Sequence, residues 1–201
     1  MPKVVLFNKP SGVLCQFSPS AGRRTLREFV PIADIYPAGR LDADSEGLLI
    51  LTDDGALQHT ISHPANKWPK TYWVQVENIP DEDGLARLRH GVDLGDFVTA
   101  PAVVNRIAEP TGLWARQPPI RVRQNIPTGW LEITISEGKN RQIRRMTAAG
   151  GFPTLRLIRQ RIGHWSIAGI ASGEHRTLTA AEIGLAGNVT KYVNRASRLA
   201  L

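Results

Sequence analysis

The alternation of apolar and polar side chains along the chain predicts short strands alternating with short helices. Residues 70–78 (KTYWVQVEN) place Tyr72, Val74 and Val76 on one side of an extended backbone, which is typical of a strand with one buried face. Residues 129–138 (GWLEITISEG) repeat this pattern, and the apolar runs at 3–7 and 48–51 predict buried strands. Further strands are expected over residues 103–109, 120–124 and 152–163.

Helices are predicted where helical spacing lies between capping residues and glycine or proline stops. They are expected within residues 25–31, 56–64, 81–94 and 138–151. Glycines and prolines interrupt residues 35–47 and the segment RQPPIRV (116–122), which predicts loops. The tail opens with Thr179 and Glu182 at capping-box spacing and predicts a weak helix. This mixture predicts an α+β fold with a mainly antiparallel sheet.

Composition restricts the class of protein and its expected location in the cell. A chain of 201 residues with 42% apolar content can bury a proper core, and its longest apolar runs are far shorter than the roughly 20 residues that span a bilayer. The N-terminal segment is too short in apolar residues for a secretory signal. Cys15 is the only cysteine, so neither an internal disulfide nor a cysteine metal cluster is expected. These features predict a cytoplasmic protein.

The charge favours a polyanionic partner. The net charge is +7, and residues 139–161 hold seven basic side chains and no acidic one. A solvated basic face would give the same composition, but a one-sided region of this length favours nucleic acid. The basic residues proposed for contact with RNA phosphates are Lys139, Arg141, Arg145, Arg156 and Arg159. Arg156 and Arg159 are expected to alternate outward from a strand.

Candidate chemistry centres on residues 39–55 (GRLDADSEGLLILTDDG), which hold five acidic residues. The segment from Asp42 to Gly47 imitates the start of a calcium loop, but its twelfth position is Asp53 rather than glutamate, and the flanks do not predict helices. No pair of carboxylates stands out as a glycosidase site, and the phosphate-binding glycine patterns do not occur. We expect neither a metal nor a cofactor.

One carboxylate in this segment lies beside a cation. Arg40 and Asp42 are two residues apart, so in extended backbone they point the same way. Such a pair can hold an ionised carboxylate in a groove with a positive rim, although structural Arg–Asp pairs are also common. The residues alone leave both interpretations open.

Three motifs resemble the successive signature regions of the RsuA-type RNA pseudouridine synthases. They are AGRLDADSEGLLILTDDG (38–55), KTYWV (70–74) and EGKNRQIRRMTAAGGFPTLRLIRQRIG (137–163), and their order and separation match the family as well. The opening LFNKPSGVL is similar to the family's first strand and turn, and the resemblance covers about residues 3 to 180. Because the catalytic region begins almost at residue 1, without the S4 module of many members, the chain is most similar to the RluE-type branch, which modifies a uridine of large-subunit ribosomal RNA.

The resemblance implies roles for individual residues. Asp42 matches the essential aspartate, Tyr72 the aromatic residue that stacks on the target base, and Arg144 the basic residue that pairs with the aspartate. Lys70 sits beside the tyrosine, and Leu157 falls near a position that packs the wall of the active site. With Arg40, these residues form the expected substrate site.

The resemblance also implies the architecture and the reaction. We expect the pseudouridine synthase fold, a mainly antiparallel mixed sheet flanked by helices, with a catalytic domain of two subdomains around one cleft over residues 1–178 and a tail over 179–201. The expected function is isomerisation of a uridine in ribosomal RNA, most simply 23S rRNA, by a monomer without a cofactor. The alternatives are a synthase that acts on small-subunit ribosomal or another structured RNA, and a non-catalytic ribosomal RNA-binding assembly protein.

Overall fold

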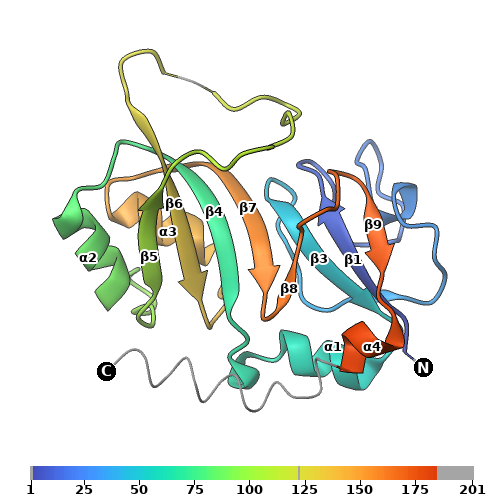
Figure 1. The fold of residues 1–201 in the computed structure, drawn as a ribbon. Helices are drawn as coiled ribbons and strands as arrows, with labels where there is room; N and C mark the ends of the chain where they lie inside the picture. Colours follow the sequence, from blue (N-terminus) through green and yellow to red (C-terminus); the bar gives the residue numbers. More distant parts are fainter. Residues whose placement is uncertain (1, 122, 185–201) are drawn as a thin grey trace.

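One nine-stranded sheet organises the fold (Figure 1). The computed structural model describes residues 2–121 and 123–184. Along the sheet the strands follow the order β5-β6-β4-β7-β3-β1-β9, while β2 pairs with β3 and β8 pairs with β7. The strands are β1 (Val4–Lys9), β2 (Tyr36–Pro37), β3 (Glu46–Thr52), β4 (Lys70–Glu77), β5 (Val103–Ile107), β6 (Thr128–Ile135), β7 (Thr154–Ile162), β8 (Trp165–Ser166) and β9 (His175–Thr177).

The described residues also form four α-helices and two short 3₁₀ helices, and α4 follows the last described strand. They are α1 (Gly55–Ser62), α2 (Glu82–His90), α3 (Gln142–Ala149), α4 (Ala180–Gly184), η1 (Leu26–Glu28) and η2 (Pro64–Asn66). Asp81 starts α2 by accepting a hydrogen bond from the Gly84 amide at 2.8 Å, and Asp54 caps α1 in the same way through Ala56 and Leu57. Asp54 is therefore a helix N-cap. No described helix is long and apolar enough to cross a membrane.

A single parallel pairing joins the two halves of the sheet, since every other strand pair is antiparallel. It involves β3 and β7 and brings Gly47 opposite Arg159. Gly47 has a φ of 99°, and a Cβ on it would lie 2.4 Å from the carbonyl oxygen of Arg159. Only glycine allows this approach of the two backbones.

The two faces of the sheet carry different cores. On one face α2 and α3 pack against β4, β6 and β5, with Leu88 and Met146 fully buried against Val74 and Ile133. The other face holds tryptophans from β4 and β6 and the apolar side chains of β3 and β1. A third cluster packs the loops of residues 13–41 against β1 and β3. Alternate residues of one strand therefore enter different cores, as the period of two requires.

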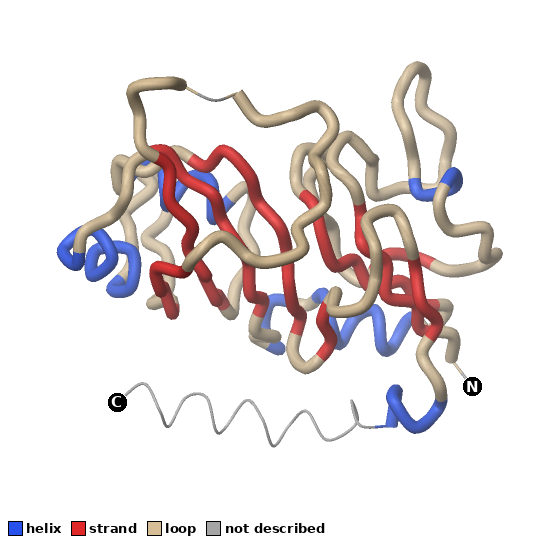
Figure 2. Tube along the Cα trace, turned by 45° about the horizontal axis from the view of Figure 1, so that its top comes forward, coloured by secondary structure: helices blue, strands red, loops and turns tan. Residues whose placement is uncertain are grey.

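The segment between β5 and β6 runs across the sheet toward β3 and then returns (Figures 1 and 2). A strand was predicted over residues 120–124, but the described residues of this stretch have none. Pro118, Pro119 and Pro127 flank it and lack the amide hydrogen that a sheet ladder needs. The prediction was wrong because an alternation of apolar and basic side chains does not ensure that a neighbouring strand is available to form hydrogen bonds with the segment.

The remaining expectations are largely confirmed. Strands β1, β3, β4, β5, β6 and β7 and helices α1, α2 and α3 overlap the predicted ranges, and the mixed, mainly antiparallel sheet is the expected fold class. The short strands β2, β8 and β9 were not predicted, and β2 lies where the sequence predicted a loop. The predicted helix at 25–31 is the 3₁₀ turn η1. Thr179 and Glu182 form the predicted capping box at the start of α4, where the amide of Thr179 donates to Glu182 at 2.8 Å. Most of the predicted tail helix lies outside the described residues.

Candidate active site

A cavity of about 540 Å³ lies where the β2–β3 loop meets the helix-covered face of the sheet. Its wall is formed by the loop at residues 38–45, the start of β4, the β6–α3 connection and the middle of β7. Seven of the predicted substrate-site and RNA-contact residues lie in this wall besides Asp42: Arg40, Lys70, Tyr72, Lys139, Arg141, Leu157 and Arg159. Residues more than 100 positions apart in the sequence therefore line one cavity.

Asp42 lies on the loop, four residues before β3. Its side chain is 39% exposed, and its Oδ2 lies 3.4 Å from Nη1 of Arg141. Arg141 binds Asp44 more closely, with hydrogen bonds of 3.1 and 2.9 Å from its two terminal nitrogens. Asp42 thus keeps an accessible carboxylate that shares a cation with its neighbour.

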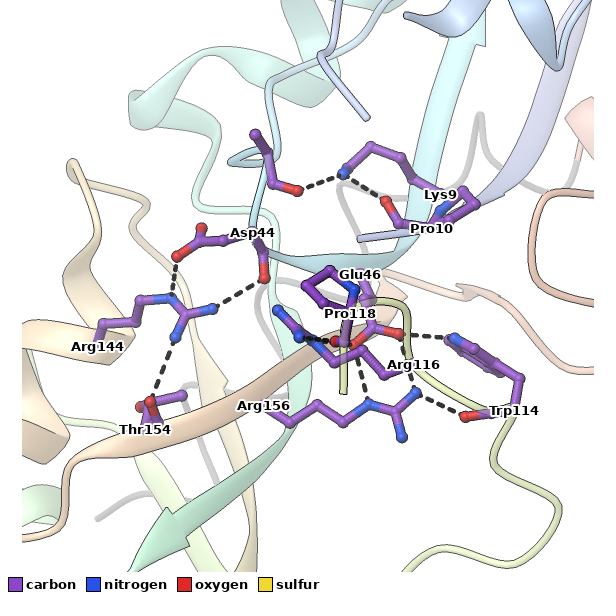
Figure 3. Close-up of polar contacts among 11 residues, drawn as sticks. Lys9, Pro10, Asp44, Glu46, Trp114, Arg116, Pro118, Arg144, Thr154 and Arg156 are labelled. Atoms are coloured by element: carbon purple, nitrogen blue, oxygen red, sulfur yellow. Dashed lines mark hydrogen bonds and ion pairs between the residues drawn. The ribbon is translucent and has the colours of Figure 1, made fainter. Parts of the chain in front are cut away.

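Arg144 does not make the contact that the resemblance implied. Its side chain donates to the carbonyl oxygens of Asp44 at 3.1 Å and Thr154 at 3.4 Å, and its Nε lies 3.5 Å from the Asp44 carboxylate (Figure 3). The direct ion pair with Asp42 comes from Arg141. Residues 141 and 144 lie one helical turn apart at the start of α3, so both guanidinium groups reach the loop that carries Asp42 and Asp44.

The electrostatics favour an ionised Asp44 at this loop. Burial tends to raise the pKa of Asp44, but the hydrogen bond from Arg141 and the charges of Arg144 and Arg141 outweigh it and lower that pKa below its usual value. Burial lowers the pKa of Arg144. The hydrogen bond with Asp44 raises the pKa of Arg141. Two arginines and two aspartates therefore form a charged cluster at the mouth of the cavity.

Tyr72 and Leu157 lie on neighbouring strands and form the apolar part of the wall. They are 7% and 5% exposed, and both belong to the core that α2 and α3 cover. Lys70 opens β4, and its ammonium group donates to the Trp68 carbonyl at 3.0 Å. Burial, together with the charge of Arg159, lowers the pKa of Lys70 to about 8. The wall therefore places an aromatic ring and a cation beside the carboxylate.

The expectation that Arg156 and Arg159 point outward is wrong. They are 8% and 3% exposed, because β7 is a central strand with both faces covered. Arg156 points away from the cavity and forms two 2.9 Å hydrogen bonds with Glu46 (Figure 3). Arg159 lies in the cavity wall and donates to backbone carbonyls of β3 and of the Asp42 loop. Neither guanidinium is part of an exposed phosphate-binding face.

Of the other basic candidates, Lys139 and Arg141 are exposed and Arg145 is partly exposed. Lys139 lies 3.7 Å above the ring of Phe97, and Arg145 pairs with Asp96 outside the cavity wall. Arg40 is exposed and lines the cavity. A positive rim therefore remains around the opening, formed by residues 40, 139 and 141.

Sequence reasoning missed Lys9. Its side chain is completely buried and donates to the carbonyls of Pro10 and Val13 at 2.9 Å each and to that of Ala43 at 3.4 Å. Burial lowers the pKa of Lys9 to about 8. A lysine at the end of a wholly apolar strand was the available signal, since an unpaired cation is rarely buried without strong acceptors.

Comparison with known proteins agrees with this geometry. Residues 3–149 match the family described as RNA pseudouridylate synthase. The chain therefore belongs to the RNA pseudouridylate synthase family, whose members isomerise uridine to pseudouridine in RNA, and the RsuA-type resemblance is confirmed.

Named relatives lie within this family. The chain is 53% identical over 176 residues to the ribosomal large subunit pseudouridine synthase E of Vibrio parahaemolyticus, covering 88% of this chain and 74% of that protein. It is 56% identical to the enzyme of the same name from Xanthomonas axonopodis pv. citri, covering 84% and 90%. Among solved structures, a pseudouridylate synthase crystal structure superposes with a TM-score of 0.72 at 29% identity, covering 92% of this chain and 73% of that one.

Proposed function

We propose that this enzyme converts a uridine of large-subunit ribosomal RNA to pseudouridine, with Asp42 as its catalytic carboxylate. The observation that carries the proposal is the exposed Asp42 carboxylate at a cavity that also presents Tyr72, Leu157 and a positive rim. A volume of about 540 Å³ is within the usual range for small-molecule sites and has room for one nucleotide.

The reaction requires the target nucleotide to leave its base stack. Flipping it out costs a few kcal/mol. Stacking on the Tyr72 ring and phosphate contacts with Arg40, Lys139 and Arg141 would offset that cost. Lys70 and Leu157 would bound the remaining sides of the base. The cavity is open enough to admit a base from RNA bound across its rim.

The chemistry is an isomerisation. The bond between N1 of uracil and C1′ breaks, the base turns, and C5 forms a new bond to C1′ while its proton is released and N1 gains one. Asp42 would act at the sugar, either by attacking C1′ or by taking a proton from C2′. Arg141, whose Nη1 lies 3.4 Å from Oδ2 of Asp42, would hold the carboxylate in place. Atoms and electrons balance without an oxidant or a phosphoryl donor.

The choice of ribosomal RNA from the large subunit rests on the relatives. Those at 52% to 56% identity carry the name ribosomal large subunit pseudouridine synthase E. Such a substrate also explains the positive rim, because phosphate contacts supply much of the affinity for RNA. Ribosomal RNA would place the reaction in the cytoplasm.

The test joins a cellular map to a purified assay. Pseudouridines should be mapped in both ribosomal subunits from cells with and without this protein, and we expect one large-subunit position to be lost. The purified protein should restore that position in unmodified RNA, whereas Asp42→Asn should bind the RNA with unchanged affinity and form no product. Product formation by Asp42→Asn would refute the role of Asp42. A lost position in the small subunit would refute the target, and an unchanged map with an inactive wild-type protein would favour an RNA-binding assembly protein.

A further inference from the structure

The loop that carries Asp42 is held along its backbone by donors from distant parts of the chain. Five consecutive carbonyl oxygens, those of residues 40 to 44, each accept a hydrogen bond. The donors are Arg159 Nη1 for Arg40 (3.2 Å), Cys15 Sγ for Leu41 (3.0 Å), the Ser45 amide for Asp42 (3.1 Å), the Gly12 amide for Ala43 (2.7 Å) and Arg144 Nη2 for Asp44 (3.1 Å). Such complete pairing fixes a loop that has no regular secondary structure.

Cys15 makes two hydrogen bonds with the Leu41 backbone through a single atom. Its thiol donates to the Leu41 carbonyl at 3.0 Å, and the Leu41 amide donates back to the sulfur at 3.4 Å. Both polar groups of the residue just before Asp42 are therefore satisfied by one side chain. Leu41 itself is 8% exposed and packs in the core beneath the loop.

The position of this contact matters for the direction of the carboxylate. Gly39 precedes the loop with a φ of 90° and has no neighbouring atom within 4 Å of its Cβ direction. Residue 39 thus turns the backbone through a conformation that other residues rarely adopt, and the contact at Leu41 is the last one before Asp42. On the far side, the Ala43 carbonyl is held by the Gly12 amide and by Lys9.

We propose that Cys15 is a positioning residue, which holds the backbone at Leu41 so that the Asp42 carboxylate points into the cavity. The inference rests on the proposed function, since it assigns Cys15 a role in the step that Asp42 performs. The thiol lies in the same cavity wall as Asp42, yet its hydrogen bonds go to the loop. Its contribution is geometric, because a misplacement of about 1 Å can reduce a rate about 100-fold.

Kinetics of three variants test the proposal. Cys15→Ala removes both hydrogen bonds, and we expect kcat to fall about 10- to 100-fold with an unchanged KM. Cys15→Ser keeps a donor and an acceptor and should recover most of that loss. Gln16→Ala is the matched control, because Gln16 is exposed and its side chain binds only within its own turn, at the Ser18 carbonyl. It should retain the wild-type kcat.

A second measurement does not depend on activity. Hydrogen exchange of the Leu41 amide should be faster in Cys15→Ala than in the wild-type protein or Cys15→Ser, while amides of β4 keep their protection. Wild-type kcat in folded Cys15→Ala, or equal losses in Cys15→Ala and Cys15→Ser with unchanged exchange at Leu41, would overturn the inference. If the wild-type protein forms no pseudouridine, the proposed function fails, and the exchange experiment alone decides whether Cys15 fixes the loop.

Discussion

Two arginine–carboxylate clusters draw their acidic residues from the five-residue stretch 42–46 and differ in their exposure to water. Glu46 at the start of β3 is 1% exposed and binds Arg156 through two hydrogen bonds, with Trp114 and Arg116 completing its surroundings. Asp42 and Asp44 are 39% and 43% exposed and share Arg141. The buried cluster ties the β5–β6 segment to the sheet, whereas the open one faces the cavity. The same type of ion pair therefore stabilises the fold at Glu46, where water is excluded. At Asp42, which water can reach, it leaves the carboxylate accessible to a substrate.

The largest effect should come from breaking the buried cluster. Glu46→Gln leaves the Arg156 guanidinium without its charged partner, and we expect a loss of about 3 to 5 kcal/mol in the free energy of unfolding. The matched change Asp44→Asn at the open cluster should cost about 1 kcal/mol or less. Urea denaturation of both variants measures the difference. Similar losses of unfolding free energy in the two variants would show that burial does not determine how much each cluster contributes to stability.

Lys9 lies near both clusters and should make the stability of the protein depend on pH. Burial lowers its pKa from 10.5 to about 8, while the charges of Glu46 and Asp44 oppose that change. Between those pH values the unfolded chain binds more protons than the folded one, so stability should rise with pH, by at most about 1.4 kcal/mol per unit from this group. Below pH 8 the group is charged in both states and adds no slope.

The variant Lys9→Met should flatten this rise in urea denaturation measured from pH 7.5 to 9.5. Lys70 has a pKa of about 8 for the same reason, so the wild-type rise should contain both contributions and Lys70→Met should remove the other. An identical slope in the wild-type protein and Lys9→Met would contradict the lowered pKa of Lys9.

At the open cluster the effect should appear in catalysis instead. Arg141→Gln removes the cation that Asp42 shares, and we expect kcat to fall about tenfold, equivalent to about 1.4 kcal/mol, with stability changed by less than about 1 kcal/mol. Single-turnover rates and urea denaturation on the same preparation measure the two effects. A loss of unfolding free energy as large as that of Glu46→Gln would show that Arg141 mainly stabilises the fold.

The smallest effect should be on RNA affinity at the rim. Lys139→Ala and Arg40→Ala should each reduce the slope of log affinity against log salt by about 1. Arg106→Ala is the control, since Arg106 is exposed on the edge strand β5 and lies away from the cavity. Equal slopes for all three variants and the wild-type protein would place the RNA path elsewhere.

The sequence predicted the elements better than the direction of individual side chains. The period of two in β4 and β6 is strong because one core covers one face, so Tyr72 and its neighbours were assigned correctly. β7 was recognised as a strand, but its arginines were expected outside, since no local pattern reveals that both of its faces are covered. Their acceptors, Glu46 and the Leu48 carbonyl, lie 110 and 111 residues earlier.

The site was predicted through motifs and corrected through contacts. Asp42, Tyr72, Lys70 and Leu157 do line one cavity, but which arginine reaches the aspartate depends on the start of α3, where Arg141 adopts a left-handed conformation with a φ of 48°. Lys9 and Cys15 were not predicted, because their partners are backbone carbonyls, and any residue can supply a carbonyl.

The place of β7 in the sheet has a consequence for synthesis of the protein. It pairs with β4 on one side and β3 on the other, so it is the element that joins the half bearing Asp42 to the half bearing Tyr72. It is also among the last strands to leave the ribosome, at residues Thr154–Ile162. The walls that carry Asp42 and Tyr72 therefore lie on opposite sides of β7, and the cavity cannot form before β7 has been made.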